Sequence, residues 1–453
     1  MVRLVLVLLG VDYLRRRTAG MYWLGFLFVL AGLVLLVDSL DNDHYFPLSV
    51  FAGLLAVGGI GALAIGALST GGLRIGRMIE GIVFVIAASL VMTGHQHGGF
   101  WLSMIFGTLF LIDGLLQCLS ATVVRYPRWR GALWGGLCEI AIAISFYSPY
   151  PFGYSGAVPY ALGLALMFVG WGMLWLAVRV RLLPEGTSVE QLMHGALYKP
   201  VAAEPGAAAD APAGPLDGGE PELVVHVWLP AGTVRQVPLQ RRPLIDRYVA
   251  AVDAKGAVWT GHVAMNAPGG PYISLDPATP MKRSLQGMRM LHAAAYNNVI
   301  GHFQSDYETD ARLRGPSTER IRIRNFDASR LRRFWHHYRQ DTTYNLTRRN
   351  CAVSVARALE AGVEGAVSRL HGSDPGWHLF FTLLLMPELW VAAQIRKRAK
   401  TMAWTPGLVL DYARALGMLV DPPSIGWFRI SMTAWRRMAG RRGGAAVPTD
   451  DSA

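Results

Sequence analysis

Cys351 stands where a polar, basic segment gives way to an amphipathic helical pattern. Arg348 and Arg349 precede it closely, and apolar residues recur at helical spacing in the run 352–361 that follows. A cysteine at the start of a helix lies beside unpaired N–H groups and the positive end of the helix dipole, and nearby arginines favour the thiolate over the thiol. Buried, unreactive cysteines are common, so Cys351 alone indicates a structural residue more often than a nucleophile.

A reactive thiol needs a base, and the candidate is His262, which follows Gly261 in a strand-like run upstream of the cysteine. Thiol catalysis requires this base within hydrogen-bond reach, a third group that fixes its tautomer, and N–H donors for the oxyanion. The start of the helix that carries Cys351 can supply such a donor. Three rival histidines lie in helical or basic surroundings without metal-ligand spacing, so we expect no metal and no cofactor. These rivals are His302, His336 and His337.

Short strand-like runs precede helical patterns in this part of the chain. The strands are expected at 223–229, 248–253, 257–265 and 271–277, and the helices at about 283–299, 328–341 and 351–361. Strands followed by helices predict an α+β domain, which we assign to residues 223–370.

The order of these motifs, from Gly261-His262-Val263-Ala264-Met265 to Asn350-Cys351, resembles the circularly permuted papain-like superfamily. That group includes the NlpC-type peptidases and the lecithin:retinol acyltransferase-like enzymes. The resemblance covers about residues 223–365, and the pair Asn350-Cys351 matches the acyltransferase-like members. It implies that His262 is the base and Cys351 the nucleophile of a permuted papain-like domain.

The same resemblance places the third polar group a little over ten residues past the histidine, which is Ser274 here. Asp276 lies two residues further, and side chains two apart on a strand point the same way. Either residue could therefore orient the ring of His262. The candidate catalytic residues are Cys351, His262, Ser274, Asp276 and Asn350.

The composition is too apolar and too rich in glycine for one soluble globule. Of 453 residues, 52% are hydrophobic, 16% are charged and 50 are glycine, which is typical of a membrane protein with an attached domain. Six apolar runs approach the ~20 residues that a bilayer core demands. They lie at about 20–40, 46–69, 78–94, 99–121, 132–149 and 157–178, and predict an all-α six-helix membrane bundle within residues 1–181. Residues 1–14 are too short to span, and we expect an interfacial lead-in helix.

Basic residues occur only in every second turn between these runs. They are Arg15 to Arg17, Arg74 and Arg77, Arg125, Arg128 and Arg130, and Arg179 and Arg181. The alternation predicts a bacterial inner-membrane protein whose N-terminus and C-terminal domain are cytoplasmic. The net charge of +12 favours anionic lipid headgroups as partners, and no nucleic-acid-binding motif accompanies it.

Glycine-rich segments at 53–59, 107–114 and 163–170 recur at a spacing on the order of 55 residues, as three helical hairpin repeats would. Glycines at such spacing let membrane helices pack closely. With its short loops and arginine pattern, the region at roughly 10–181 resembles the HdeD family of small six-helix inner-membrane proteins linked to acid resistance. That resemblance implies a role in stress or acid tolerance without giving a mechanism.

Three acidic residues, Glu80, Asp113 and Glu139, fall inside or near the expected bilayer. An ionisable group at that depth is costly, and it indicates either a proton relay or a polar clasp between helices. Glu80 lies three residues after Arg77 and could simply be paired with it.

The remaining segments are expected to connect or anchor. Residues 182–222 are rich in alanine, proline and glycine and predict a flexible linker. Residues 371–440 predict interfacial or packing helices, and 377–394 fits either a helix in the membrane interface or a buried helix of the domain. Residues 441–453 are expected to be disordered.

Two functions of different class fit this organisation. In the first, the bundle anchors a thiol hydrolase or acyltransferase that acts on an amide, ester or thioester of lipid, lipoprotein or peptide origin. In the second, the protein is a non-enzymatic membrane stress component whose C-terminal domain is a degenerate partner-binding module.

Overall fold

The computed structural model describes most of the helical regions and most of the C-terminal domain. The described residues are 2–40, 48–68, 72–93, 98–125, 129–148, 153–183, 187–189, 192, 222–229, 251–252, 258–259, 261–279, 292–371 and 376–421.

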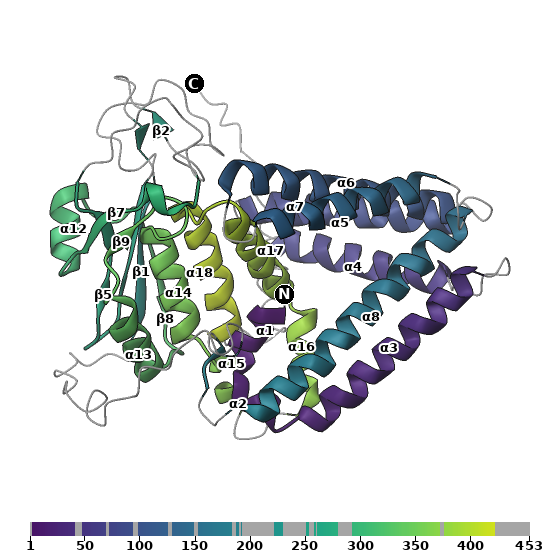
Figure 1. Ribbon diagram of the computed structural model, residues 1–453, viewed down its shortest axis with the longest axis horizontal. Helices are drawn as coiled ribbons and strands as arrows, with labels where there is room; N and C mark the ends of the chain where they lie inside the picture. Colours follow the sequence, from purple (N-terminus) through teal and green to yellow (C-terminus); the bar gives the residue numbers. More distant parts are fainter. Residues whose placement is uncertain are drawn as a thin grey trace, which may run out of the picture. The chain divides into compact units, whose positions relative to one another are not determined.

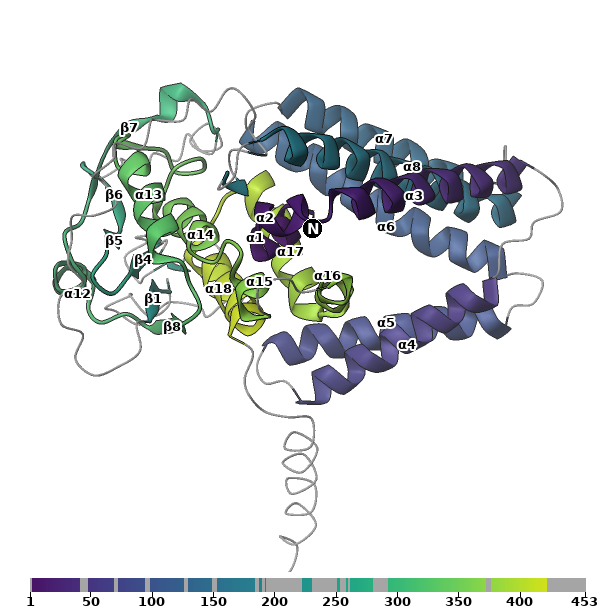
Figure 2. The ribbon, with the colours of Figure 1, turned by 90° about the horizontal axis from the view of Figure 1, so that it is seen from below.

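The C-terminal domain is built on an antiparallel sheet with the strand order β5-β4-β1-β8. These strands are β5 (Tyr272–Ile273), β4 (His262–Asn266), β1 (Leu223–Trp228) and β8 (Glu319–Ile323). Alternate side chains, among them Val225, Val263 and Met265, are buried on one face, as the period of two along a strand requires. Helices α14 (Cys351–Gly362) and α18 (Pro406–Val420) lie on that face, and α12 (Tyr307–Arg314) lies on the opposite side (Figure 1 and Figure 2).

A second sheet, of order β6-β7-β9, continues from the first. Its strands are β6 (Leu275–Pro277), β7 (Val299–Phe303) and β9 (Thr343–Tyr344), and a two-stranded pair joins β2 (Ala251–Val252) to β3 (Val258–Trp259). The other elements of the domain are η3 (Ala295–Asn297), α13 (Ala328–Tyr338), α15 (Ala366–Leu370), α16 (Trp377–Leu385) and α17 (Pro387–Thr401). The α+β character is therefore confirmed for the residues that the structure describes.

The helices predicted at 328–341 and 351–361 are found as α13 and α14. The one predicted at 283–299 is wrong in its described part, because residues 292–299 form only η3 and the start of β7. A polar η3 turn interrupts the apolar periodicity there, and the strand hydrogen bonds of β7 replace helical ones. Residues 280–291 lie outside the described part of the chain.

The N-terminal segment packs into the domain core, which contradicts the prediction of an interfacial helix. Helix α1 (Val2–Leu9) is followed by α2 (Val11–Arg15), and Leu4 to Leu9 are all buried. The carbonyl of Val7 accepts a 2.7 Å hydrogen bond from Gly365 N. Apolar residues on every side of α1 can be covered only inside a protein or a bilayer, and here protein covers them.

The start of the expected linker is also held in this core. Val189 and Leu192 are buried, and Val189 N donates to the Glu364 carboxylate at 3.0 Å. Residues 193–221 lie outside the described part of the chain, so the flexibility expected for them stays a prediction.

Six long helices occupy the positions of the six apolar runs. They are α3 (Thr18–Leu40), α4 (Leu48–Leu68), α5 (Gly72–Thr93), α6 (Gly98–Val124), α7 (Trp129–Tyr147) and α8 (Gly153–Leu182). In the described residues, α3, α6 and α8 are long and apolar enough to cross a membrane. The bent pair Trp377–Leu384 and Glu388–Thr401, with a 67° break, passes the same test as one broken span. Among the described residues, three helices therefore have the length and composition of a membrane span, or four if the bent pair counts as one span.

Glycines bring these helices into close contact, as predicted, but in pairs other than the expected hairpins. A Cβ added to Gly114 on α6 would lie 2.8 Å from the carbonyl oxygen of Gly136 on α7. Gly59 on α4 faces Gly81 on α5, and further glycines join α3 to α8. The close pairs are thus α4–α5, α6–α7 and α3–α8.

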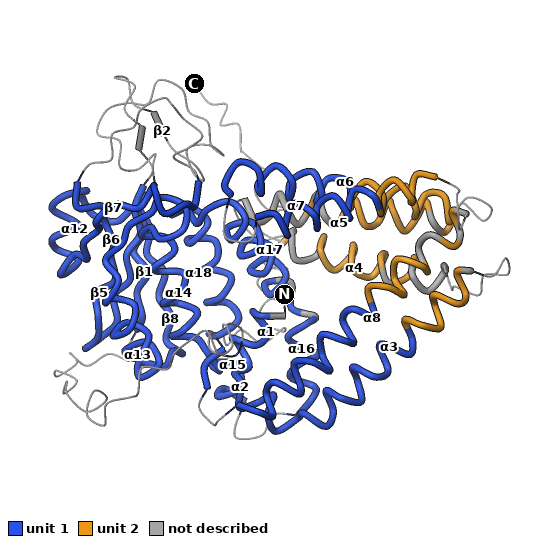
Figure 3. The backbone as a smooth tube through the Cα atoms, viewed as in Figure 1, with its two compact units in different colours: residues 1–31, 111–141, 166–421 blue, residues 32–110, 142–165, 422–453 orange. Residues whose placement is uncertain are grey.

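The chain divides into two compact units (Figure 3). One contains residues 1–31, 111–141 and 166–421, and the other contains 32–110, 142–165 and 422–453. The expected boundary after residue 181 therefore differs from the packing, because parts of α3, α6, α7 and α8 cluster with the C-terminal domain. All residues of the candidate site lie in the first unit.

Candidate active site

A tight polar turn delivers Cys351 to the first position of α14. The side chain of Asn345 accepts hydrogen bonds from the backbone N–H groups of Thr347 at 3.2 Å and Arg348 at 3.1 Å, which closes the turn. Backbone hydrogen bonds in both directions between Asn345 and Arg349 complete it. Asparagine favours such turns because its short side chain can bond to nearby backbone groups.

Asn350 caps the helix. Its Oδ1 accepts from Val353 N at 2.8 Å, and its Nδ2 donates to the carbonyls of Leu346 and Trp404 at 2.8 and 3.0 Å. Both ends of the side-chain amide are thus used to hold the start of α14. In the structure, Asn350 is therefore the N-cap that holds the start of α14 next to Cys351.

His262 lies at the start of β4 and is 3% exposed. Its Nε2 is 2.8 Å from Ser274 Oγ, and its Nδ1 is 3.6 Å from Asp276 Oδ1. Cys351 lies close enough to the ring to raise its pKa. The structure therefore brings four of the five predicted residues together around one imidazole.

Asp310, on α12, completes this group and was missed from the sequence. It is fully buried and accepts hydrogen bonds from Ser274 Oγ at 2.7 Å and Tyr272 OH at 2.6 Å. Arg314, four residues later, also bonds to it. From the sequence, Asp310 and Arg314 look like an ordinary i,i+4 pair on a polar helix, so no local signal singled them out.

The hydrogen bonds assign the tautomer of His262. A serine hydroxyl has one hydrogen, and Ser274 donates it to Asp310, so its oxygen must accept the proton of His262 Nε2. This leaves Nδ1, which lies 3.6 Å from Asp276 Oδ1, as the ring nitrogen that is available for proton exchange. The orienting group is therefore a serine backed by a buried carboxylate.

The surrounding charges favour a protonated ring. Burial alone would lower the pKa of His262, but the charge of Cys351 and hydrogen bonds to Asp310 and Cys351 raise it to about 9. Burial acts to raise the pKa of Asp310, but its bond to His262 and the charge of that ring hold it well below the usual value. A protonated ring that is backed by a buried carboxylate can stabilise negative charge on a neighbouring sulfur.

The atoms of His262, Asp276 and Asp310 also lie within 4.8 Å of one another, which is close enough to hold a metal ion. However, the guanidinium of Arg314 bonds to both carboxylates, at 2.6 Å for Asp276 Oδ2. Gln304 Nε2 donates to the same oxygen at 3.0 Å. A fixed positive charge in this position opposes a second cation, so the donor set fits an acid–base role better than a metal site.

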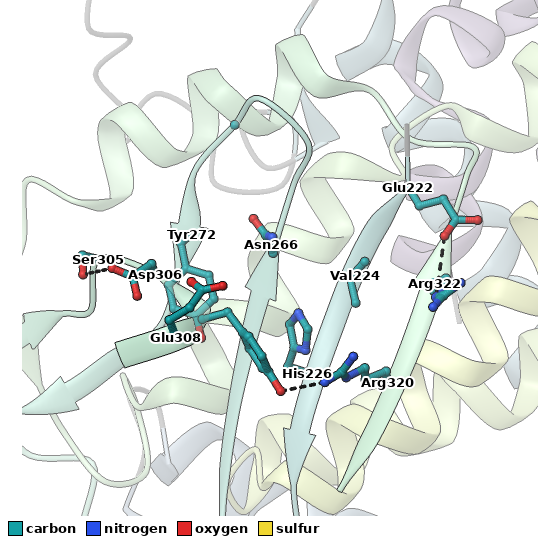
Figure 4. A pocket seen from close by; sticks show the side chains of 12 residues that line it. Glu222, Val224, His226, Asn266, Tyr272, Ser305, Asp306, Glu308, Arg320 and Arg322 are labelled. Atoms are coloured by element: carbon teal, nitrogen blue, oxygen red, sulfur yellow. Dashed lines mark hydrogen bonds and ion pairs between the residues drawn. The ribbon is translucent and has the colours of Figure 1, made fainter. Parts of the chain in front are cut away.

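A pocket of about 570 Å³ lies beside strands β1, β4 and β8 and is lined by His226, Asn266 and Arg320, among others (Figure 4). Tyr272 lines it and links it to Asp310, while Arg320 donates to the Tyr307 hydroxyl at 2.8 Å. Burial and the charge of Arg320 lower the pKa of His226 to about 4, so this lining ring is neutral at neutral pH. Arg322 pairs with Glu222 at 3.7 Å.

One of the rival histidines, His302, is linked to this group through Gln304, which also donates to Asp276. His302 is exposed on β7 and contacts Gln304 at 3.0 Å, while His336 and His337 are in the last turn of α13. All three cysteines, Cys118, Cys138 and Cys351, are free thiols.

No protein-family model, no curated protein and no solved structure matches the chain. The two resemblances drawn from the sequence therefore stay predictions, and the argument for function rests on the geometry of the site.

Proposed function

We propose that this protein is a membrane-tethered thiol hydrolase or acyltransferase that acts on an amide, ester or thioester. The observation that carries the proposal is the buried ring of His262, which joins Cys351 to Ser274 and Asp310. A histidine held in one tautomer between a free thiol and an acidic relay has the parts that a thiol acyl-transfer site requires.

In the proposed reaction, the thiolate of Cys351 attacks the carbonyl carbon of the substrate and forms a C–S bond. The first N–H groups of a helix have no partner within it, and Asn350 accepts only that of Val353 among the first three. The N–H groups of Cys351 and Ala352 would therefore stabilise the oxyanion.

Collapse of the tetrahedral intermediate breaks the bond to the leaving group, which takes a proton from His262 Nδ1. His262 then removes a proton from water or from an acceptor group, which attacks the thioester and regenerates the thiolate. Water gives hydrolysis, and an acceptor amine or alcohol gives acyl transfer. Ser274 and Asp310 keep the ring oriented through both steps.

The proposed setting is the cytoplasmic face of a bacterial inner membrane. The unit that contains Cys351 also contains arginines just after α6, at the start of α7 and at the end of α8, which are Arg125, Arg130, Arg179 and Arg181. Arginines concentrate on the cytoplasmic side, which supports placing the domain there. The six-helix resemblance extends the proposal to a role in stress or acid tolerance, and a topology reporter fused after Arg181 tests the compartment.

The decisive experiment is labelling of the full chain with an alkylating or acylating thiol probe, followed by mass spectrometry of the Cys351 peptide. We expect Cys351 to react faster than free cysteine, and His262→Ala to lower the rate by about 10²- to 10⁴-fold, the usual contribution of a positioned base. The matched control is His336→Ala, because His336 is exposed in the last turn of α13.

Two results would count against this function. If Cys351 reacts no faster than free cysteine, and His262→Ala leaves that rate unchanged, the domain is a non-enzymatic module. Circular dichroism of each variant shows whether a slower rate reflects unfolding.

A further inference from the structure

Helix α17 holds two other helices through two consecutive side chains. Arg396 bonds to Glu360 on α14, with Nε 2.6 Å from Oε1 and an η-nitrogen 3.2 Å from Oε2. Lys397 pairs with Asp113 on α6, with Nζ 2.5 Å from Oδ2. Consecutive residues of an α-helix point about 100° apart, so one helix can bind two partners on different sides.

The contact with α14 is buried and fully satisfied. Glu360 is 7% exposed, and its carboxylate also accepts from Tyr412 OH at 3.0 Å and from Arg3 at 3.4 Å. Burial would raise the pKa of Glu360, but the charges of Arg396 and Arg3 hold it below its usual value. This ionised carboxylate fixes α14 to α17, and α14 begins at Cys351.

The contact with α6 lies within a span-length apolar helix. Asp113 is inside the stretch Gly99–Val124, and Glu139 on α7 lies close enough to interact with its carboxyl group. The side chains of Lys397 and Asp113 are 46% and 34% exposed on the protein itself, so a surrounding bilayer would cover the pair and strengthen it relative to water. Lys397 therefore holds α17 against the pair α6–α7. Asp113 thus takes part in a polar clasp between helices, which is one of the two roles expected from the sequence.

We propose that Asp113 is a positioning residue for the Cys351 site and acts through Lys397, Arg396 and Glu360. Through these contacts the arrangement of α6 and α7 sets the position of α14 and thus of the Cys351 thiol relative to His262. A displacement of about 1 Å between reacting groups can cost about 10²-fold in rate, so a small movement of α14 is sufficient. The inference rests on the proposed function, because a reactive Cys351 is what reports the movement.

The test uses the full chain in phospholipid nanodiscs, with iodoacetamide as probe and mass spectrometry of the Cys351 peptide as readout. We expect Asp113→Asn and Lys397→Met each to lower the second-order rate constant by about 2- to 30-fold, the range for residues along a coupling network. The double variant should be no slower than either single one, because both changes remove the same pair. Asp113→Glu, which keeps the charge, should restore most of the rate.

Gln394→Ala is the matched control, since Gln394 is exposed on the same helix. The inference is overturned if the wild-type thiol is reactive and the single variants react at the wild-type rate, or if the two losses multiply in the double variant. Failure of Asp113→Glu to restore the rate would also overturn it. If the wild-type thiol is no more reactive than free cysteine, the proposed function itself fails, which is a distinguishable result.

Discussion

Two buried carboxylates in the same unit are held by the same kinds of partner. Asp310, beside the candidate site, accepts hydrogen bonds from Arg314 and Tyr272. Glu360, near the end of α14, accepts them from Arg396 and Tyr412. Each is fully or almost fully buried.

The two carboxylates differ in their remaining neighbour. Asp310 bonds through Ser274 to His262, a ring that can lose its proton, whereas Glu360 faces Arg3, which is always charged. A carboxylate balanced only by permanent charges stabilises the fold, while one that faces a titratable ring can support proton transfer. The titratable neighbour, and not the buried acid itself, marks the candidate site.

The largest effect on stability is expected from Glu360→Gln. Removing the charge leaves the Arg396 and Arg3 guanidinium groups buried without their counter-ion, and breaking a buried pair typically costs about 3–5 kcal/mol. Thermal unfolding of the full chain in detergent measures the loss. The pH dependence of Cys351 labelling should keep its wild-type midpoint in this variant. A stable Glu360→Gln protein would show that the pair contributes little.

Asp310→Asn should change the rate of the proposed reaction and its dependence on pH. The imidazolium of His262 persists below its pKa of about 9 and is lost as the pH rises through that value. A step that needs this proton should therefore slow above about pH 9. Asparagine removes the negative charge and an acceptor, so the pKa of His262 falls and the loss should begin at lower pH.

Acyl-probe turnover measured from pH 6 to pH 10 tests this prediction. We expect Asp310→Asn also to lower the rate at pH 7 by about 10-fold, which corresponds to about 1.4 kcal/mol of lost interaction. Glu308→Gln, an exposed carboxylate on the same helix, is the control. An unshifted pH profile would remove Asp310 from the site.

The smallest effect is expected from Asn350→Ala. The substitution removes the cap of α14 and its bond to Trp404, and the loss of such a cap costs about 1 kcal/mol. Both the thermal midpoint and the labelling rate should fall slightly, because the start of the helix frays. Asn350→Asp, which keeps the capping oxygen, should recover most of the midpoint. If Asn350→Ala abolished labelling without loss of stability, the residue would have a direct catalytic role.

Local patterns in the sequence were sufficient for the parts of the site that depend on one element at a time. The helix start at Cys351 follows from its capping residue and apolar period. The strand that carries His262 and the two short strands on either side of Ser274 follow from alternation. The six helical positions follow from hydropathy in the same way, although only three of the helices reach the length and composition of a span in the described residues.

Contacts between distant segments were decided only by the tertiary structure. Asp310 lies on a short polar helix with no signal of burial, and it reaches His262 only because α12 packs against the sheet. Likewise, α1 enters the domain core and Lys397 reaches Asp113 across 284 residues of sequence. Burial and charge pairing at such separations depend on which surfaces meet in the folded chain, and no local periodicity encodes that. The sequence by itself determined the cysteine, the histidine and the apolar helices, and packing decided which acid serves the histidine.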